Sequence, residues 1–472
     1  MSTSLSEAAL LPDPERQRVY ALLRRFGLGV ASFQTLGPDF RYWFYGDDAC
    51  LAYLDTGSAW VVGGLPLAAV DRYNELIQAF QKDARAHGRR VSYVTLDPRF
   101  AAAAGLDTIC FGEIPIWNPQ HWEQTVRGSR SLREQFRRAR AKGVRTRLLT
   151  TAEVEDASGP VRKAMVAIVT VWLRSRRAPP LRFIARVEPF FLIPDRRYLA
   201  AEWNGQLIAF LVAVPAYARN GWMIETIFRA PGKTPNGVSE LLVDAAMRSF
   251  AESGATYATL GAAPLTDRVN VSLRIGRFLG SRLYNFKGLY TFKAKLKPER
   301  WEPIHIAYAH GGSSILAFWD VAMAFSPADK PALALSVLRR YRQPIIRVML
   351  ILLIPWTLLL AGIDTTRWFP SETVQWGWVA FDVLLIVLFA RLFQRHGPVL
   401  ATCLAVLTSI DSLLTAWQAA LYNIPRARTA IDAIGIATAV IGPILVTAFL
   451  WLTLQDAPAA RDDTAAGVPV TT

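Results

Sequence analysis

The chain has 472 residues, 52% of them hydrophobic, and a formal net charge of +15. Its length allows two or three domains, and its three cysteines lie in no metal-binding spacing, which excludes a disulfide framework and a cysteine-based zinc site. The positive charge favours a polyanionic partner, either a nucleic acid or an anionic membrane. The N-terminus has no charged region followed by a long apolar run, so we expect no secretory signal.

The first part of the chain alternates between short β-type runs and helical patterns, which predicts a mixed α/β fold. Strands are expected at 50–55, 59–64, 90–96, 197–203, 206–214, 222–228 and 257–261. Helices are expected at 69–88, 131–143, 159–176 and 238–254. We therefore place a first β-rich lobe at 15–125, a basic connecting helix at 126–145 and a second lobe at 146–310.

The predicted connecting helix is strongly basic. Nine Lys and Arg residues fall between Arg127 and Arg147, against one acid, Glu134. Helical spacing of three and four residues aligns four of the arginines in one basic ridge, namely Arg130, Arg133, Arg137 and Arg140. We expect this ridge to bind a nucleic acid or anionic lipid headgroups; the alternative is a solvated helix face.

The segment 222–248, WMIETIFRAPGKTPNGVSELLVDAAMR, carries the most chemistry. A strand with Glu225 ends at Arg229, a Pro/Gly loop follows, and a helix opens near Asn236 and Gly237. Free backbone N–H groups at a helix start, beside an arginine, make an anion site. Glu225 and Glu240 could flank this site and hold an ammonium group. The alternative is a plain strand–loop–helix capped by the asparagine.

Two later segments add weaker signals. In 260–268, LGAAPLTDR, a strand runs into a Gly/Pro loop of the kind that often contacts ligands. In 284–303, YNFKGLYTFKAKLKPERWEP, aromatic residues alternate with polar or basic ones, which predicts a strand suited to base stacking and phosphate contact. An amphipathic strand with a solvated basic face is the alternative. The residues concerned are Tyr284, Phe286, Tyr290, Phe292, Lys287, Lys293, Lys295 and Lys297.

Four long apolar runs, at 346–363, 376–393, 398–421 and 432–454, predict an all-α domain of four transmembrane helices at 346–455. An amphipathic linker at 311–345 precedes it; its stretch 313–325 suits either a membrane-surface helix or a simple packing helix. The polar tail at 456–472 is expected to be disordered. Arginines near the spans predict that the N-terminal part and the tail are cytoplasmic, at a bacterial-type inner (cell) membrane.

The order of these segments resembles the C-terminal catalytic domain of the phosphatidylglycerol lysyltransferase (lysylphosphatidylglycerol synthase) family. The resemblance covers about residues 20–310 and is most specific over 222–303. The matching pieces are VVGGLP at 61–66, SLREQFRRARAKG at 131–143, WLRSRRAPPLRF at 172–183, FRAPGKTPNG at 228–237, LGAAPL at 260–265 and the whole of 284–303.

The resemblance implies tandem acetyltransferase-like (GNAT-type) lobes that transfer an aminoacyl group from aminoacyl-tRNA to a lipid hydroxyl, such as that of phosphatidylglycerol. This lipid modification is tied in the family to resistance against cationic antimicrobial peptides. No cofactor is implied, and the sequence has no clear [RQ]xxGx[GA] loop for CoA. An acyl-CoA-dependent N-acyltransferase acting on an amino lipid, and a non-catalytic membrane-tethered module, remain alternatives.

The chain departs from the family pattern in three places. Thr226 stands where the family has an acid, and Glu225 lies next to it. Gly64-Leu65-Pro66 stands where the family commonly has Gly-Asp-Pro, and the membrane part follows the catalytic part instead of preceding it.

Site roles follow from the motifs and the resemblance together. We expect Glu225, Arg229, Glu240 and Tyr284 to be catalytic. Substrate binding is expected of Asn236, Gly237, Asn285, Lys293 and Lys295, and tRNA or anion binding of Arg130, Arg133, Arg137 and Arg140. No histidine lies in these segments, so we expect no metal.

Overall fold

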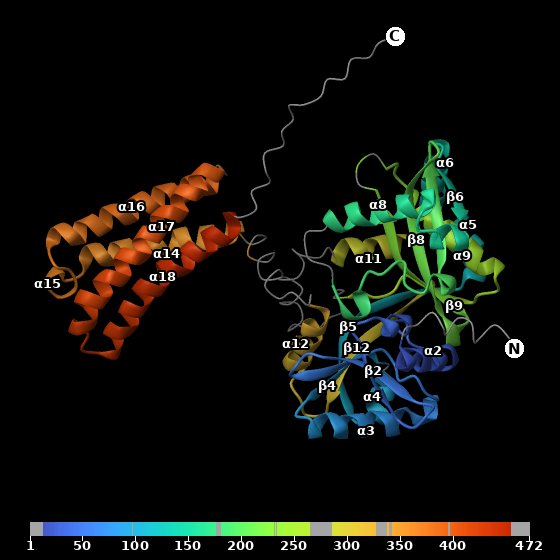
Figure 1. Cartoon of the computed structure of the whole chain (residues 1–472). Coiled ribbons are helices and arrows are strands. Elements are labelled where there is room, and N and C mark those ends of the chain that lie inside the picture. The colour runs from blue at the N-terminus through green and yellow to red at the C-terminus, as the bar shows by residue number, and fades with distance from the viewer. Residues whose placement is uncertain are drawn as a thin grey trace, which may run out of the picture. The chain divides into compact units, whose positions relative to one another are not determined.

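The fold is taken from a computed structural model that describes residues 13–454, except 97, 176–180, 231, 233, 265–285, 327–337, 339–341, 395 and 396. The chain divides into two compact units, Met1–Lys330 and Pro331–Thr472 (Figure 1). The first unit is α/β and the second is helical, so the predicted fold class is confirmed. The predicted tail at 456–472 lies outside the described residues.

The first unit is built on one mixed sheet of twelve described strands, in the order β1-β2-β3-β4-β12-β5-β10-β9-β8-β7-β6, with β11 paired to β5. The strands are β1 (Arg41–Phe44), β2 (Cys50–Asp55), β3 (Ala59–Gly63), β4 (Arg90–Leu96), β5 (Leu106–Trp117), β6 (Arg145–Leu148), β7 (Arg197–Trp203), β8 (Gln206–Ala216), β9 (Gly221–Arg229), β10 (Tyr257–Thr259), β11 (Ala263–Pro264) and β12 (Arg300–Ala309). The seven predicted strands are all present.

The sheet consists of two similarly built halves. In the first, the antiparallel strands β1, β2 and β3 lead through a helix to β4, which is parallel to β3. In the second, the antiparallel strands β6 to β9 lead through a helix to β10, which is parallel to β9. This repetition is the arrangement that tandem acetyltransferase-like lobes require.

The halves exchange one strand each. β5 follows β4 in the chain but pairs with β10, and β12 follows β10 but pairs with β4; β5 and β12 are antiparallel neighbours along their whole length. The predicted boundaries of the two lobes remain a proposal. The structure adds that backbone hydrogen bonds across β5 and β12 join the halves into one sheet.

Helices cover both faces of the sheet. They are α2 (Pro14–Phe26), α3 (Tyr73–Ala86), α4 (Pro98–Ala103), α5 (Trp122–Gly128), α6 (Arg130–Ala141), α7 (Thr151–Glu155), α8 (Pro160–Arg174), α9 (Val238–Glu252), α11 (Phe286–Lys295) and α12 (Ser314–Phe325), with short 3-10 turns η1 (Phe33–Leu36), η2 (Val70–Arg72), η3 (Pro119–His121), η4 (Phe183–Ala185), η5 (Ile193–Asp195) and η6 (Tyr217–Arg219). In the first half α3 and α12 pack on opposite faces, and in the second half α9 and α8 do so.

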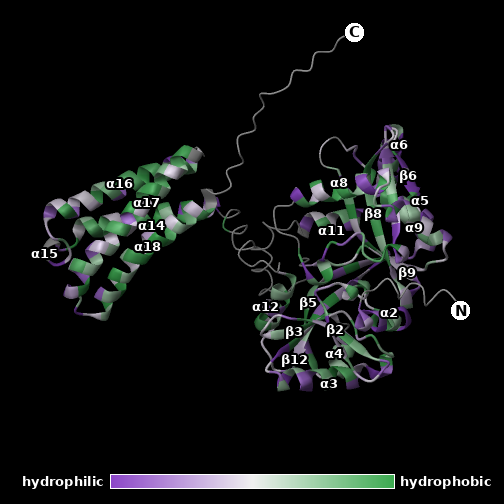
Figure 2. Ribbon diagram, viewed as in Figure 1, coloured by the Kyte–Doolittle hydropathy of each residue, from purple (hydrophilic) through white to green (hydrophobic). Residues whose placement is uncertain are grey.

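The second unit contains four helices long and apolar enough to cross a membrane, coloured green in Figure 2. They are α14 (Arg342–Gly362), α16 (Glu372–Gln394), α17 (Pro398–Gln418) and α18 (Ala430–Leu454); α15 (Thr365–Trp368), a π turn η7 (Ala419–Asn423) and η8 (Ile424–Arg426) connect them. The four share a leucine- and phenylalanine-rich core. Their outward side chains are also apolar, for example Leu358, Val399 and Leu413, which suits a lipid environment.

One predicted element is wrong. The segment 284–303 was expected to be a single strand, yet its described part forms the helix α11 followed by the start of β12. Phe292, Lys293 and Leu296 turn toward the interior at helical spacing. Five of the described strands were also not predicted, namely β1, β5, β6, β11 and β12. Prolines at 115 and 303 hide β5 and β12, because proline lacks the donor that a sheet ladder uses.

Candidate active site

β9 is irregular at Glu225, the residue beside the expected acid. Val212 of β8 lies opposite Thr226 and Ala213 lies opposite Ile224, so Glu225 is the extra residue of a β-bulge. A bulge re-aims the side chains around it and is common next to active sites. The bulge changes the strand register next to Thr226, the position at which the family has an acid.

Glu225 is held by a buried arginine. Its carboxylate accepts from Arg196 Nη1 and, at 3.1 Å, from Gln34 Nε2. The Arg196 side chain is only 2% exposed and its guanidinium lies over the Phe33 ring, 5.0 Å from the centroid. Because Gln34 and Phe33 belong to η1, this ion pair ties β9 to the first half of the unit.

Glu225 and Glu240 do not flank one site. Met223 and Phe33 pack in the same cluster, and Glu225 bonds into η1 next to it. Ile224, one residue along, packs with Leu241 of α9. These contacts place Glu225 on the face of the sheet that η1 covers, whereas Glu240, on α9, lies on the opposite face. The structure therefore does not bring together the two acids that were expected to hold an ammonium group.

α9 begins without a side-chain cap. Gly237 is the N-cap residue, with φ of +92°, and Asn236 next to it is exposed. A Cβ at Gly237 would lie 2.7 Å from the backbone oxygen of Gln135 in α6, so both the dihedral and the close approach require glycine. The first-turn N–H groups of α9 receive no side-chain cap from either residue, as an anion site requires.

Arg229 ends β9 and is exposed. Among the described residues it has no acidic partner, so its guanidinium is available to a ligand. Arginine at such a position offers a planar fork for phosphate or for an oxyanion.

Glu240 lies in the first turn of α9 and is paired with α11. Its Oε1 accepts from Lys295 Nζ at 2.7 Å, with the Glu240 side chain 11% and the Lys295 side chain 32% exposed. The structure thus brings together two of the expected site residues, and a lysine ammonium occupies the position where an ammonium group was expected. A second ammonium group could displace or join it.

Lys293 lies two residues before Lys295 and is almost completely buried. Its Nζ donates to the carbonyl oxygens of Gly261, at 2.8 Å, and Ala262, at 2.7 Å. Burial without a carboxylate partner lowers the pKa of Lys293 to about 7. Its two bonds fix the loop that follows β10, which is the Gly/Pro loop expected to contact ligand.

An open hollow of about 530 Å³ runs along α11. It is lined by Lys287, Gly288, Thr291, Phe292 and Lys295, so it contains Lys295 of the Glu240 pair and adds a second lysine. Cationic groups beside an aromatic ring suit a phosphate-bearing ligand. Tyr284 and Asn285, also expected at the site, lie outside the described residues.

The basic ridge of α6 is exposed but partly paired. Arg137 pairs with Glu134 at 2.8 Å, Arg140 pairs with Asp244 of α9 at 2.9 Å, and Arg133 donates to backbone oxygens of α5. Arg130 is exposed and has no acidic partner in the described part of the chain. Since α6 packs on α9 through Leu132, Phe136 and Ala139, the ridge belongs to the half that carries α9.

Sequence reasoning missed three buried polar residues. Arg196 holds Glu225, and Asp244 accepts from Trp122 Nε1 at 2.9 Å as well as from Arg140. Glu113, 5% exposed on β5, lies opposite Ala263 of β11, next to the loop held by Lys293. Of these three, Glu113 offered a signal as an acid inside the apolar strand β5, whereas Arg196 precedes β7 and Asp244 lies in the helix α9. The described residues contain no cluster of ligands that could hold a metal ion.

Comparisons with known proteins agree with this arrangement. Residues 21–308 match the family described as phosphatidylglycerol lysyltransferase, C-terminal. Phosphatidylglycerol lysyltransferase of Bacillus subtilis (strain 168) is 23% identical over 338 residues, which are 67% of this chain and 38% of that protein. The chain thus spans a little over a third of that relative's length.

Two solved structures share the fold. One is the C-terminal domain of an Agrobacterium fabrum protein described as a lysylphosphatidylglycerol synthetase, with a TM-score of 0.57, 23% identity, and coverage of 70% of this chain and 99% of that one. The other is L-PGS from Bacillus licheniformis, with a TM-score of 0.57, 21% identity, and coverage of 67% and 98%. Because the family match covers more than half of its residues, the chain belongs to the family of phosphatidylglycerol lysyltransferase C-terminal domains.

Proposed function

We propose that the protein transfers an aminoacyl group from aminoacyl-tRNA to the hydroxyl of a membrane lipid such as phosphatidylglycerol. Family membership supports lipid aminoacylation, and four apolar helices keep the enzyme next to its lipid. The single observation that carries the proposal furthest is the Glu240–Lys295 pair in the first turn of α9, because it combines an amine-binding carboxylate with a phosphate-binding cation.

The reaction needs orientation more than strong acids or bases. The lipid hydroxyl attacks the ester carbonyl of the aminoacyl group, the new ester forms, and the 3′-oxygen of tRNA leaves with the proton that the hydroxyl gives up. Holding both reactants in line and stabilising the tetrahedral oxyanion supply most of the rate. We assign Arg229 and the N–H groups opening α9, at Asn236 and Gly237, to the oxyanion or to phosphate.

The remaining roles follow from charge. Glu240 binds the amino group of the aminoacyl donor, and Lys295 contacts the phosphate of tRNA or lipid. Lys293 shapes the neighbouring loop through its two carbonyl contacts. Glu225 is a positioning residue, because its carboxylate is already bound by Arg196. The basic ridge receives the acceptor arm of tRNA.

Location and biological role are part of the same proposal. The arginines near the spans support a cytoplasmic position for the first unit and the tail, on the side of the inner membrane where charged tRNA is found. Adding an amino acid to an anionic lipid lowers the negative surface charge, which weakens the attraction of cationic antimicrobial peptides.

Lipid mass spectrometry of cells with and without the protein tests the proposal. We expect a new species with the mass of a lipid plus an aminoacyl residue, lost in Arg229→Ala and in Glu240→Ala, and lost in isolated membranes after RNase treatment. RNase-resistant activity that needs acyl-CoA would point to the N-acyltransferase alternative. Unchanged lipids at normal protein abundance would instead indicate a non-catalytic membrane-tethered module.

A further inference from the structure

α12 has two apolar faces, and only one of them is packed. Ala317, Val321 and Ala324 lie in a core cluster against β3, β4 and β12. The opposite side exposes Ile315 (67%), Leu316 (47%) and Trp319 (57%). These three residues, called here the α12 apolar face, lie at helical spacing and carry no charge. Large apolar side chains gathered on one helix face mark a binding surface.

A basic pocket lies directly beside this face. It has a volume of about 180 Å³, and among its lining residues are Arg85, Arg89, Arg90 and Asp320, together with Leu316 of the apolar face. One water occupies about 30 Å³ in the liquid, so the pocket holds a group of several heavy atoms. Since Leu316 belongs to both features, the pocket and the apolar face form one continuous surface.

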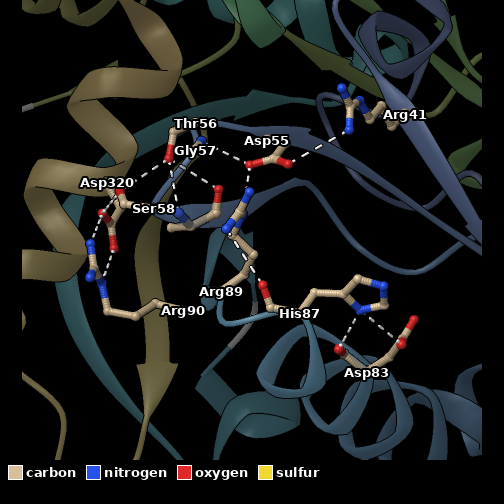
Figure 3. A network of polar contacts seen from close by, with 11 residues as sticks. Arg41, Asp55, Thr56, Gly57, Ser58, Asp83, His87, Arg89, Arg90 and Asp320 are labelled. Carbon is tan, nitrogen blue, oxygen red and sulfur yellow. Dashed lines mark hydrogen bonds and ion pairs between the residues drawn. The ribbon is translucent and has the colours of Figure 1, made fainter.

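Two of the three arginines in the pocket are paired with aspartates, and the third leaves a positive charge at one end of it. Figure 3 shows Asp320, on α12, facing Arg90 and Ser58, and Asp55 facing Arg89 and Arg41. Asp320 is 1% exposed and lies 2.6 Å from Arg90 Nη2, so this pair is satisfied. Arg89 lies 3.2 Å from Asp55.

Arg85, unlike Arg89 and Arg90, is not paired with an aspartate among the described residues. It is exposed and bonds to the neutral side-chain oxygen of Gln81 at 3.3 Å, and no acidic partner for it occurs in the described part of the chain. Three arginines line the pocket against one aspartate. An anion entering the pocket would therefore meet the unpaired Arg85 guanidinium and the edge of Arg89.

We propose that the α12 apolar face and the arginine pocket together dock on an anionic phospholipid bilayer, with one headgroup phosphate in the pocket and Ile315, Leu316 and Trp319 among the upper acyl chains. Tryptophan prefers this interfacial depth, and an apolar helix face flanked by arginines is the usual form of an in-plane membrane contact. The proposal concerns how residues 1–330 meet the bilayer, and it stands whether or not they transfer an aminoacyl group.

The short connection between α12 and the first apolar span favours a bilayer over a protein partner. Only 16 residues, 326–341, separate α12 from the first apolar span at Arg342. Even fully extended, they reach roughly 55 Å, so α12 cannot leave the neighbourhood of the membrane. A weak contact then acts at high effective concentration, and positive charge in the pocket matches the negative surface of a phosphatidylglycerol membrane.

Spin labelling of the full chain in vesicles tests this contact. The label is placed by Trp319→Cys, with Cys110→Ser and Cys403→Ser; Cys50 is buried and burial raises its thiol pKa to about 12, so it stays unlabelled. Gln124→Cys, an exposed site on α5, gives the aqueous control label. The readout is the accessibility of each label to oxygen and to a water-soluble nickel chelate, in vesicles of phosphatidylglycerol and phosphatidylcholine and in phosphatidylcholine alone.

We expect the label at 319 to be more accessible to oxygen than to the nickel chelate in vesicles that contain phosphatidylglycerol, and to show a smaller difference in phosphatidylcholine alone. The label at 124 should remain accessible to the nickel chelate in both. Arg85→Gln should lower the ratio of docked to free α12 about fivefold, the effect of one basic residue at an anionic surface. Lys82→Gln is the matched control, because Lys82 is exposed on the same helix outside the pocket. Leu316→Asp should abolish docking in both lipids.

Three outcomes would overturn the proposal. The first is an aqueous label at 319 in phosphatidylglycerol vesicles. The second is an equal effect of Arg85→Gln and Lys82→Gln, since the pocket would then not bind a headgroup. The third is a label at 319 whose spectrum is broadened by the label on a second copy of the chain, because protein would then cover the face.

Discussion

The Nζ atom of Lys295 lies 2.7 Å from Oε1 of Glu240, so α11 and the first turn of α9 are joined by an ion pair at the proposed site. The pair is mostly buried on the carboxylate side and open on the lysine side. An incoming amine therefore competes with a resident one for the same carboxylate.

The pair gives the first prediction. Lys295→Gln should lower the free energy of unfolding by about 1–3 kcal/mol, because the Glu240 carboxylate then lacks a charged partner, and should reduce lipid aminoacylation at least tenfold. Thermal inactivation in detergent and product formation in proteoliposomes measure the two effects. Lys295→Arg keeps the charge and should recover stability more than activity. Full activity in Lys295→Gln would remove this lysine from the site.

The second prediction concerns pH and Lys293. In the folded protein its pKa is lowered to about 7, whereas in the unfolded chain it is about 10.4. Above pH 7 the unfolded state therefore binds more protons than the folded state, and stability rises with pH. Lys293→Met removes this dependence. From pH 7 to 9 the free energy of unfolding of the wild type should rise by about 2–3 kcal/mol relative to that of the variant, at roughly 1.4 kcal/mol per pH unit.

The measurement is the midpoint of thermal inactivation of both proteins at pH 6 to 9 in the same detergent. Below pH 7 the two curves should run parallel, because Lys293 is then protonated in both states. Parallel curves over the entire range would show that Lys293 does not titrate there. A constant offset is expected in any case, since methionine cannot donate to Gly261 and Ala262.

Gly237 supplies the third prediction. In Gly237→Ala the alanine must adopt a left-handed backbone conformation, and its Cβ would lie 2.7 Å from the backbone oxygen of Gln135. The helices α6 and α9 must therefore separate slightly. We expect a loss of about 2–4 kcal/mol, from strain and from disturbed packing, with lower activity. Gly254→Ala is the matched control, because Gly254 has φ of +76° but open space around its Cβ position. It should cost only about 1 kcal/mol. Equal losses would mean that the contact with α6 is unimportant.

The basic ridge gives the fourth prediction. Arg130→Gln with Arg133→Gln should weaken tRNA binding and reduce the slope of log affinity against log salt by about 1–2. Filter binding at several salt concentrations measures both. Lys82→Gln with Lys163→Gln removes the same charge at exposed sites elsewhere and should leave the slope unchanged. If membrane association alone changes, the ridge contacts lipid instead.

Arg140 should behave differently from the rest of the ridge. Arg140→Gln leaves Asp244, 1% exposed, with one charged partner fewer, which should cost about 1–3 kcal/mol of stability. The expected signature is a lowered midpoint of thermal inactivation, which Arg130→Gln alone should not produce. Asp244 also lies 3.2 Å from Arg248 Nε. A normal midpoint would show that Arg248 and Trp122 suffice to satisfy Asp244.

Regular elements were predictable because their signals are local. The strands at 50–55 and 222–228 and the helix at 238–254 have the expected periods, and the four apolar helices follow from hydropathy. The helix α11 was missed because its aromatic residues also fit a period of two, although Gly288 interrupts that alternation. Phe286 and Tyr290 are four residues apart in the sequence, as are Phe292 and Leu296, and this spacing indicates a helix.

The candidate site was predictable only in part. Glu240 and Lys295 could each be named from its own segment, but the contact between them joins α9 to α11 and was not predicted. Glu225 was named but its partner was not. Arg196 lies just before β7, and it meets Glu225 at the β-bulge of β9. Long-range pairing depends on sheet register, which no local pattern determines.

The strand exchange has a mechanical consequence. β12 lies in the middle of the sheet, hydrogen-bonded to β4 on one side and β5 on the other, and the chain continues from it through α12 to the first apolar span. A pull from the membrane anchor therefore loads β12, which can leave the sheet only when both ladders of hydrogen bonds break. Tension from the membrane anchor would in this way be carried by an interior strand that is hydrogen-bonded on both sides.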